Sequence, residues 1–325
     1  MRIEKAELRL AMLGMIEGNG HPYSWSAIIN GYNPEEMAKC PFPVIPQYLS
    51  EVPLNTMRVP GARVTRVWTD DPADAPKVAA ASRIEKVVSR PEDVIGEVDA
   101  VIIGTDDGHE HVRRARPFVE AGLPMFVDKP LAINLPDLNQ FIRWHEAGKV
   151  FLSSSNMRYA PETKMVMRQK AQLGDLRWIT TCTCKTWERY AIHALEAIWP
   201  ILGPGFLGVR TESQKDSDIA YITHKSGVQV NLAAIVDAIG GYGTFHVFGT
   251  KGNLSVTCWD TYNAFRNQLV AFIEMLRTGE RPYPLSETME LMTVIIAGLR
   301  SRERGGAFVE VKEIFAELEA PFGRK

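Results

Sequence analysis

The sequence has few cysteines and no long apolar run. Only 4 of its 325 residues are cysteine, too few for the disulfide framework of a secreted domain in so long a chain. No apolar stretch approaches the roughly 20 residues that a membrane-spanning helix needs. The first residues are charged and lack the apolar core of a signal peptide. These absences predict a cytoplasmic protein with no membrane partner.

The sequence also lacks an excess of charge of either sign. Lysine and arginine total 37 and aspartate and glutamate 39, for a net charge of −2. A nucleic-acid-binding surface usually needs a concentrated positive charge, which this composition does not indicate. His109-Glu110-His111 lacks the spacing that places two histidines on one helix face, so no metal site is expected. The expected partner is a small molecule.

The first half of the chain alternates strand-like and helix-like segments. Strand-like runs lie at 8–13, 62–69, 99–105, 125–128 and 150–155, and helical patterns separate most of them. This alternation is typical of a parallel, doubly wound α/β sheet. We expect residues 1–155 to form a dinucleotide-binding Rossmann domain.

A glycine-rich turn follows the first of these strands. Gly14, Gly18 and Gly20 precede a helix that we expect to begin near Ala27. In a dinucleotide-binding unit, such a turn and helix hold a pyrophosphate through backbone N–H groups and the helix dipole. The spacing is G-x-x-x-G-x-G and not the usual G-x-G-x-x-G, so an ordinary turn is the alternative interpretation.

Asp70 lies at the end of the second strand, where an acid can bind the hydroxyls of a cofactor ribose. No arginine follows it directly, which favours NAD over NADP. The proline-rich residues 33–60 are expected to form a long excursion, as a lid or a substrate-side loop, before this strand. A helix N-cap is the alternative role for the acids, and Asp70 and Asp71 can divide the two roles between them.

Asp128-Lys129-Pro130 ends the strand-like run at 125–128. Proline cannot donate to a sheet ladder and keeps the preceding residue extended, so Lys129 should lie at the carboxyl edge of the sheet. Open α/β sheets bind their ligands at this edge. A solvated loop lysine is the alternative. Thr105, the last residue of the 99–105 run, is a further candidate for contact with the cofactor.

The second half has a different pattern, with successive strands and few helices between them. We therefore expect residues 156–325 to form an α+β domain with a large mixed or antiparallel sheet, used for substrate binding and oligomerisation. The expected helices are 161–171, 193–202, 262–277 and 286–302, and the expected strands are 177–185, 207–211, 218–223, 227–235, 243–249, 252–257 and 308–311.

Tyr190, His193 and Glu196 are the best acid–base candidates in this half. His193 and Glu196 are three residues apart and share a helix face. A histidine exchanges protons near neutral pH, and a carboxylate one turn away can orient its ring or bind a substrate hydroxyl. The alternative is a histidine at a helix start beside an exposed glutamate.

In order and spacing, these segments resemble the Gfo/Idh/MocA family of NAD(P)-dependent oxidoreductases, over almost the whole chain. Asp128-Lys129-Pro130 matches the family's Glu-Lys-Pro, with a side chain one methylene shorter at the acid. His193-x-x-Glu196 is similar to its H-x-x-D motif. Further matches are His111, at the start of the helix before that strand, the segment Asn156-x-Arg158-Tyr159-x-Pro161, and the closing helices from Asn267.

The resemblance implies hydride transfer between a nicotinamide and a carbon of a sugar or polyol. It also implies that Lys129 bonds the reacting hydroxyl and that His193 takes or gives the proton. His111 and Asp128 would then belong to the cofactor-binding region. A lysine ammonium beside the alcohol oxygen would favour developing alkoxide charge. In this family the open sheet of the second domain commonly pairs subunits, so a homo-oligomer is expected.

One departure from the family bears on the acid–base chemistry. Many members have an aspartate four residues before the helical histidine, and here that residue is Arg189. His193 works without a helper, or Glu188, Tyr190 or Glu196 replaces it, or the chemistry differs. Two other functions therefore stay open. One is an NAD-dependent lyase or glycosidase that uses transient oxidation, and the other is a nucleotide-binding sensor without catalysis.

Overall fold

The computed structural model describes residues 2–319, which form two compact units. The first unit extends to Asp128 and also contains Trp144–Ser153 and Phe265–Pro282. The second unit contains Lys129–Arg143, Ser154–Ala264 and the described residues from Tyr283 to Glu319. The first unit therefore includes a late segment, Phe265–Pro282, that chain order alone assigns to the second half.

The first unit contains a six-stranded parallel sheet in the order β3-β2-β1-β4-β5-β6, which confirms the doubly wound Rossmann prediction. Its central strands are apolar on both sides and buried on both faces, as a parallel sheet covered by helices requires. The strand order reverses between β1 and β4, and ligands bind at such a reversal. The strands are β1 (Leu8–Leu13), β2 (Ala62–Trp68), β3 (Lys86–Val87), β4 (Ala100–Ile103), β5 (Met125–Val127) and β6 (Phe151–Leu152).

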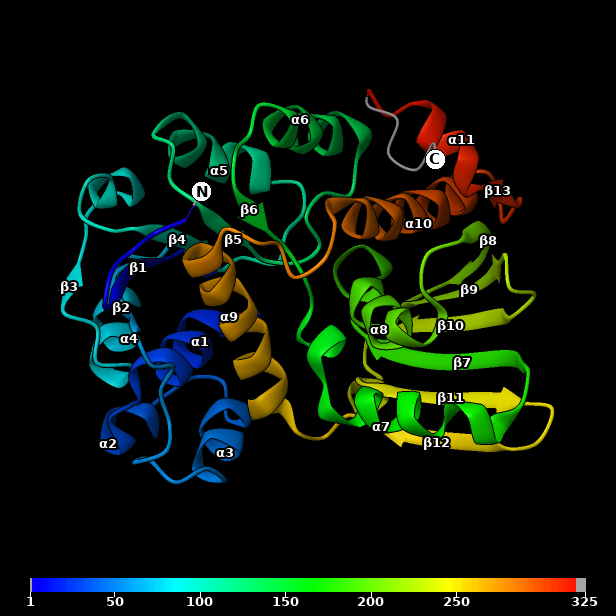
Figure 1. Ribbon diagram of the computed structural model, residues 1–325, viewed down its shortest axis with the longest axis horizontal. Coiled ribbons are helices and arrows are strands. Elements are labelled where there is room, and N and C mark those ends of the chain that lie inside the picture. The colour runs from blue at the N-terminus through cyan, green and yellow to red at the C-terminus, as the bar shows by residue number, and fades with distance from the viewer. Residues whose placement is uncertain (1, 320–325) are drawn as a thin grey trace. The chain divides into compact units, whose positions relative to one another are not determined.

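Helices cover both faces of this sheet. In Figure 1, α1 (His21–Asn30) and α4 (Ala75–Ala81) lie on one side and α5 (His111–Glu120) on the other. α1 begins before the expected start near Ala27, because Pro22 fits the first turn of a helix. Further helical segments of the chain are η1 (Pro91–Val94), α6 (Leu135–Glu146) and α9 (Thr261–Thr278).

The proline-rich excursion is more ordered than the predicted loop. It contains two short helices, α2 (Pro34–Met37) and α3 (Val44–Ser50). The side chain of Asn33 accepts a hydrogen bond from the backbone N–H of Glu35 and caps α2. α3 packs on α1, where the Tyr48 hydroxyl donates to the hydroxyl of Ser24. Prolines at helix starts and a capping asparagine thus turn an apparent loop into a packed element.

The second unit contains a seven-stranded mixed sheet in the order β12-β11-β7-β10-β9-β8-β13. β7 and β10 run parallel, and the other neighbouring strands run antiparallel, as expected for this half. The strands are β7 (Leu176–Cys184), β8 (Phe206–Gln214), β9 (Ser217–His224), β10 (Gln229–Ile235), β11 (Thr244–Gly249), β12 (Asn253–Thr257) and β13 (Val309–Glu310).

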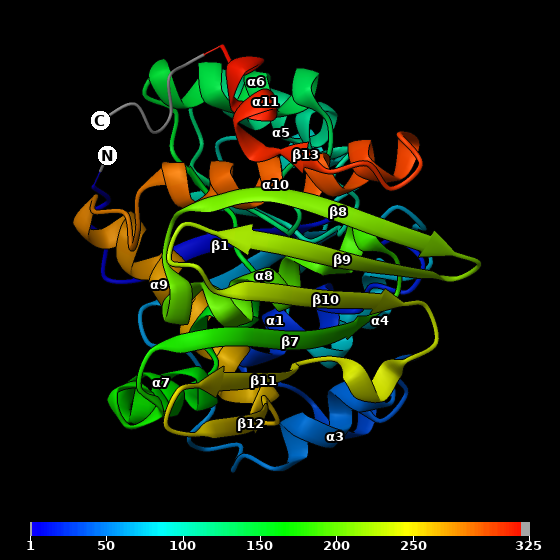
Figure 2. The same cartoon turned by 90° about the vertical axis from the view of Figure 1, so that its right-hand side faces the viewer.

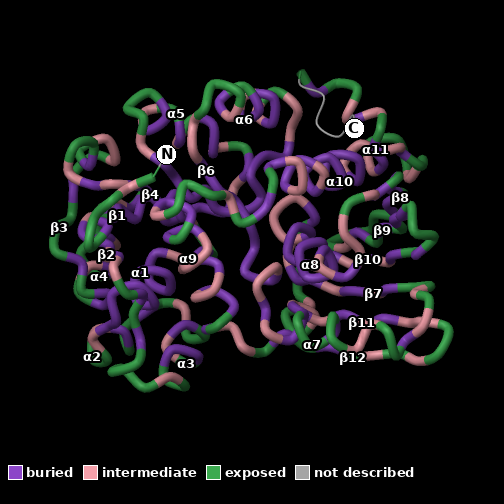
Figure 3. Tube along the Cα trace, viewed as in Figure 1, coloured by how far each residue is buried: buried purple, intermediate pink, exposed green. Residues whose placement is uncertain are grey.

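One face of this sheet is covered and the other is open. The largely buried helices α8 (Trp187–Leu202) and α10 (Leu285–Glu303) cover the inner face, and Figure 3 shows their burial. The uncovered strands face the viewer in Figure 2. Alternation along β9 buries Ala220 and Ile222 and leaves Ile219 and Tyr221 exposed. Other helical segments are η2 (Asn156–Tyr159), α7 (Pro161–Gln169), η3 (Lys170–Leu173), η4 (Ile239–Gly241) and α11 (Val311–Ala316).

None of the helices in residues 2–319 has the length and apolarity that crossing a membrane requires.

Candidate active site

The glycine turn after β1 brings together several predicted cofactor-binding residues. Gly14 has φ of +92°, and a Cβ added there would lie 2.7 Å from the Thr105 side chain and 3.5 Å from a carboxylate oxygen of Asp70. Gly18 also has positive φ, and α1 begins directly after Gly20. Positive φ angles favour glycine at these positions. The backbone N–H groups of the turn and of the start of α1 therefore lie at the carboxyl edge of the sheet. A Cβ at Gly20 would instead meet the excursion, so that glycine also serves packing.

Asp70 and Asp71 make different contacts, and the expected helix N-cap role of Asp71 is wrong, because Asp74 is the N-cap residue of α4. One oxygen of Asp70 accepts a hydrogen bond of 3.0 Å from the backbone N–H of Met15 in the glycine turn. Its other oxygen accepts one of 2.7 Å from the Arg114 guanidinium. Asp71 instead accepts a hydrogen bond from the backbone N–H of Ala73. Arg114 lies 44 residues from Asp70, so no local sequence pattern pointed to this ion pair.

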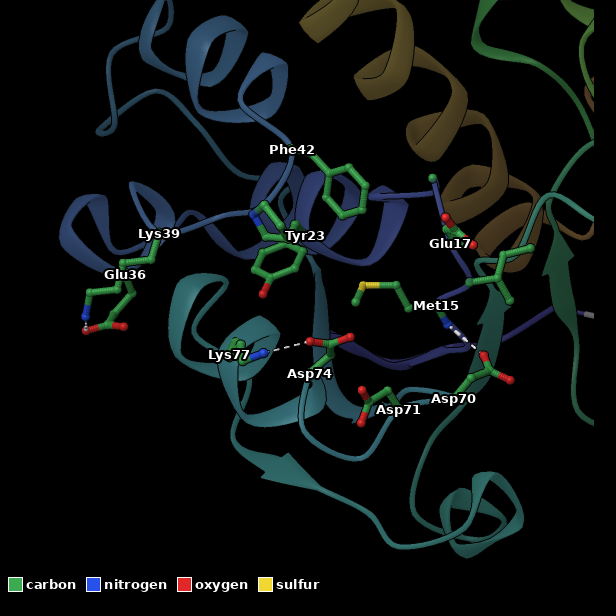
Figure 4. Close-up of a pocket in the computed structure, with 13 residues that line it drawn as sticks. Met15, Glu17, Tyr23, Glu36, Lys39, Phe42, Asp70, Asp71, Asp74 and Lys77 are labelled. Atoms are coloured by element: carbon green, nitrogen blue, oxygen red, sulfur yellow. Dashed lines mark hydrogen bonds and ion pairs between the residues drawn. The ribbon is translucent and has the colours of Figure 1, made fainter. Parts of the chain in front are cut away.

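A cavity of about 940 Å³ lies beside the glycine turn, within the first unit. Figure 4 shows Met15, Tyr23 and Phe42 around its middle and Asp70 at one end. Phe42 belongs to the excursion, so this segment forms one wall of the cavity. Burial raises the pKa of Tyr23 to about 12, which keeps its hydroxyl neutral at physiological pH.

His111 contacts the backbone of the turn that follows β4. It is buried at the start of α5, and its ring Nε2 lies 2.7 Å from the backbone carbonyl oxygen of Thr105. A carbonyl only accepts, so this nitrogen carries the proton and donates it. The predicted cofactor-site histidine therefore holds the turn after β4 in place.

Asp128 is fully buried and bonded to the start of α1. Its carboxylate lies 2.5 Å from Nδ1 of His21 and accepts a hydrogen bond of 3.3 Å from the side chain of Asn19. The ring of His21 stacks on Trp25 with centroids 4.2 Å apart. His21 was not among the predicted site residues, and its distance of 107 residues from Asp128 explains why.

Lys129 begins the second unit and is not a solvated loop lysine. Only 2% of its surface is exposed, and its ammonium nitrogen lies 4.2 Å from the ring centre of Tyr190. The ammonium of Lys185 lies 4.4 Å from the same ring centre. The negative face of an aromatic ring stabilises a nearby cation. Tyr190 is thus a platform for two positive charges.

His193 is buried on α8 among hydroxyl groups. Its Nδ1 lies 2.7 Å from the hydroxyl of Ser155 and 3.3 Å from that of Tyr242. The Tyr242 hydroxyl also donates to the side-chain oxygen of Asn156, and burial raises its pKa well above its usual value. The rings of Tyr190 and Tyr242 flank the imidazole at 4.6 and 4.9 Å. Ser155 and Tyr242 were not predicted, because they lie 38 and 49 residues from His193.

The two glutamates proposed as helpers of His193 are engaged elsewhere. Glu196 is buried and pairs with Arg158, which also donates to Glu287. Burial raises the pKa of Glu196, and the charge of Arg158 opposes that rise. Glu188 pairs with Arg302. The structure therefore places Ser155 and Tyr242 at the Nδ1 edge of His193 and places Glu196 in an ion-pair network.

Comparison with known proteins finds an oxidoreductase family and inositol dehydrogenases. A family model described as "Oxidoreductase family, NAD-binding Rossmann fold" matches residues 50–155. Inositol 2-dehydrogenase 1 of Saccharopolyspora erythraea is 24% identical over 315 residues, covering 82% of this chain and 93% of that protein. Inositol 2-dehydrogenase of Rhodococcus erythropolis is 31% identical over 124 residues, 37% of this chain and 36% of that protein.

Solved structures share the fold along nearly the whole chain. The myo-inositol 2-dehydrogenase of Lactobacillus plantarum superposes with a TM-score of 0.74 at 14% identity, covering 94% of this chain and 99% of that one. The scyllo-inositol dehydrogenase of Lactobacillus casei, solved with bound NAD(H) and scyllo-inositol, gives a TM-score of 0.73 at 14% identity, with the same coverage of each chain. At these identities the likeness establishes the architecture.

Proposed function

We propose that the chain is a member of the Gfo/Idh/MocA family of NAD-binding oxidoreductases and a polyol dehydrogenase that oxidises an inositol or a closely related cyclic polyol. Its cofactor is NAD, which accepts or returns the hydride. The relative matched over 315 residues is named as an inositol 2-dehydrogenase, which supports this substrate class.

The residues of the first unit fit the dinucleotide. The turn with Gly14 and Gly18 and the start of α1 supply backbone N–H groups for a pyrophosphate. Asp70 is held at the end of β2 by the N–H of Met15, and its carboxylate is partly exposed. A carboxylate in this position accepts hydrogen bonds from ribose hydroxyls. This arrangement is the observation that supports NAD binding most directly.

The residues of the second unit suit proton exchange with an alcohol. The positive charge of Lys129 would stabilise negative charge that develops on the substrate oxygen. The Nδ1 edge of His193 faces two hydroxyls, which can donate to it or accept from it as the ring changes protonation. His193 can therefore take a proton at Nε2 during oxidation and return it during reduction.

The test is a fluorescence titration with NADH, followed by turnover assays with myo-inositol, scyllo-inositol, other polyols, sugars and sugar acids. We expect NADH to bind and at least one cyclic polyol to reduce NAD. Failure to bind NADH, or turnover confined to substrates without a secondary alcohol, would overturn the proposal. Turnover with only catalytic amounts of NAD would identify the lyase or glycosidase alternative, which no structural observation favours.

We also propose that the open face of the second sheet pairs with another copy of the chain, as the family resemblance implies. Trp178, Ile219 and Tyr221 are exposed on this sheet, and the Trp178 ring stacks on Phe248 at 4.8 Å. Exposed apolar and aromatic patches are typical of protein interfaces. The cytoplasmic location expected from the sequence stays a prediction.

A further inference from the structure

The guanidinium of Arg114 is held between two carboxylates at the cofactor edge of the first unit. Its terminal nitrogens donate to both oxygens of Asp70, at 2.7 and 3.3 Å. Its Nε and one terminal nitrogen donate to a single oxygen of Glu110, at 2.8 and 2.5 Å. Only 9% of the Arg114 side chain is exposed. The arginine is therefore fixed in position. Asp70 occupies its two terminal nitrogens, which we call the outer fork.

Arg114 reaches the glycine turn from α5, on a different strand–helix unit from Asp70. A Cβ added at Gly14 would lie 3.3 Å from a terminal nitrogen of Arg114 and 3.5 Å from the Asp70 carboxylate. The terminal nitrogens of Arg114 thus lie against the backbone of the glycine turn, where we propose that the dinucleotide binds. No arginine follows Asp70 directly in the sequence, but the fold brings Arg114 of α5 next to it.

We propose that Arg114 forms a latent binding site for a ribose 2′-phosphate, which Asp70 keeps closed. The inference rests on the proposed function, because it concerns the same cofactor site. A guanidinium fork binds the oxygens of a phosphate as well as those of a carboxylate. While Asp70 fills the fork, the three side chains carry a net negative charge that repels a 2′-phosphate. Arg114 and Asp70 together then select NAD over NADP.

Glu110 holds the guanidinium of Arg114 in place independently of Asp70. It holds Arg114 through the inner edge of the guanidinium, four residues away on the same helix. Removing the Asp70 side chain would leave that inner contact intact. The outer fork would then stay aimed at the position that Asp70 had occupied. The fork is therefore expected to accept a phosphate without rearrangement of α5.

The test is Asp70→Ser, with dissociation constants for NADH and NADPH measured by fluorescence titration. Hydrogen bonds to charged groups contribute about 1.5–3 kcal/mol, so NADPH should bind at least about tenfold more tightly than to the wild-type protein. NADH should bind about tenfold more weakly, because the ribose hydroxyls lose an acceptor. Asp70→Asn is the second variant, since an amide keeps an acceptor for the N–H of Met15.

Three further variants separate the effect of the Arg114 guanidinium from that of the overall charge. Asp71→Ser removes one negative charge from the same turn without opening Arg114, and should leave the affinity for NADPH within about threefold of the wild-type value. In the double variant Asp70→Ser/Arg114→Ala the gain in NADPH affinity should vanish. In Asp70→Ser/Arg113→Ala it should persist, because Arg113 is an exposed neighbour whose guanidinium pairs with Glu110.

The inference is overturned if neither Asp70 variant gains affinity for NADPH while both melt as the wild-type protein does. It is equally overturned if the gain survives Arg114→Ala. Wild-type binding of NADH is measured in the same series. Its absence would count against the proposed function, whereas normal wild-type binding without a gain in the variants would count against the latent site alone.

Discussion

At the scale of single residues, Lys129 and Glu196 are two buried ionisable groups with different surroundings. Lys129 has almost no exposed surface and lies over the ring of Tyr190, so its charge is held in a poorly solvated place. There it acts more strongly on a nearby oxygen than it would in water. Glu196 is equally buried, but its charge is compensated by Arg158. We propose that the first charge serves the chemistry and that the second, paired with Arg158, stabilises the fold.

We expect Lys129→Met to lower kcat by about 100-fold or more, since the stabilisation of developing alkoxide charge is lost. The measurement is steady-state oxidation of the best polyol found in the turnover assays. Lys185→Met is the matched control, because it removes the other cation over Tyr190, and its effect should be smaller by at least about tenfold. Equal activity of Lys129→Met and the wild-type protein would contradict the role proposed for Lys129.

We expect Glu196→Gln to act on stability more than on catalysis. Breaking a buried ion pair leaves Arg158 incompletely compensated, which costs about 3 kcal/mol in the free energy of unfolding. Urea unfolding measures this change, and Glu188→Gln, whose partner Arg302 is more exposed, should cost less than about 1 kcal/mol. A large loss of kcat in Glu196→Gln at unchanged stability would instead support the catalytic role that the sequence suggested.

At the scale of elements, the contact between His21 and Asp128 joins the start of α1 to the end of β5. Asn19, just before α1, also donates to Asp128, so one buried carboxylate holds the glycine turn against the strand that leads to Lys129. The shorter acid and the histidine are complementary in size. The family that this chain resembles has glutamate at this position. Here the ring of His21 fills the space that the longer side chain would need, which explains the aspartate.

This fit predicts that Asp128→Glu is harmful although it restores the family's residue. The Nδ1 of His21 already lies 2.5 Å from the carboxylate, so an added methylene has no room and should cost about 1–3 kcal/mol of stability. Thermal unfolding measures the loss. A second substitution, His21→Ser, should recover part of it by opening space. If Asp128→Glu alone were as stable as the wild-type protein, the two side chains would not be matched.

At the scale of the whole molecule, the open face of the second sheet is not covered by any helix among the described residues of its own unit. Tyr221→Glu would place a charge in the middle of that face and should convert an oligomer to smaller species, because burying an unpaired charge is costly. Size-exclusion chromatography with light scattering measures the change. Leu54→Glu, at an exposed apolar residue of the first unit, is the control and should not alter the mass.

Much of the architecture could be predicted because its signals are local. The expected segments 8–13, 62–69, 218–223 and 286–302 agree with β1, β2, β9 and α10 to within a residue or two. Hydrophobic periodicity and glycine or proline at the ends specify such elements over a few neighbouring residues. The two-residue strand β3 and the short helices α2 and α3 escaped prediction, because so few residues carry no clear period.

The sequence alone determined which residues stand at the ends of elements, and so it identified Asp70, Lys129 and His193 as candidates. Their partners were decided only by the tertiary structure. Arg114 with Asp70, His21 with Asp128, and Ser155 and Tyr242 with His193 are separated by 38 to 107 residues. Contacts of this kind depend on how whole strands and helices pack, and packing leaves no mark in the local pattern that a sequence displays.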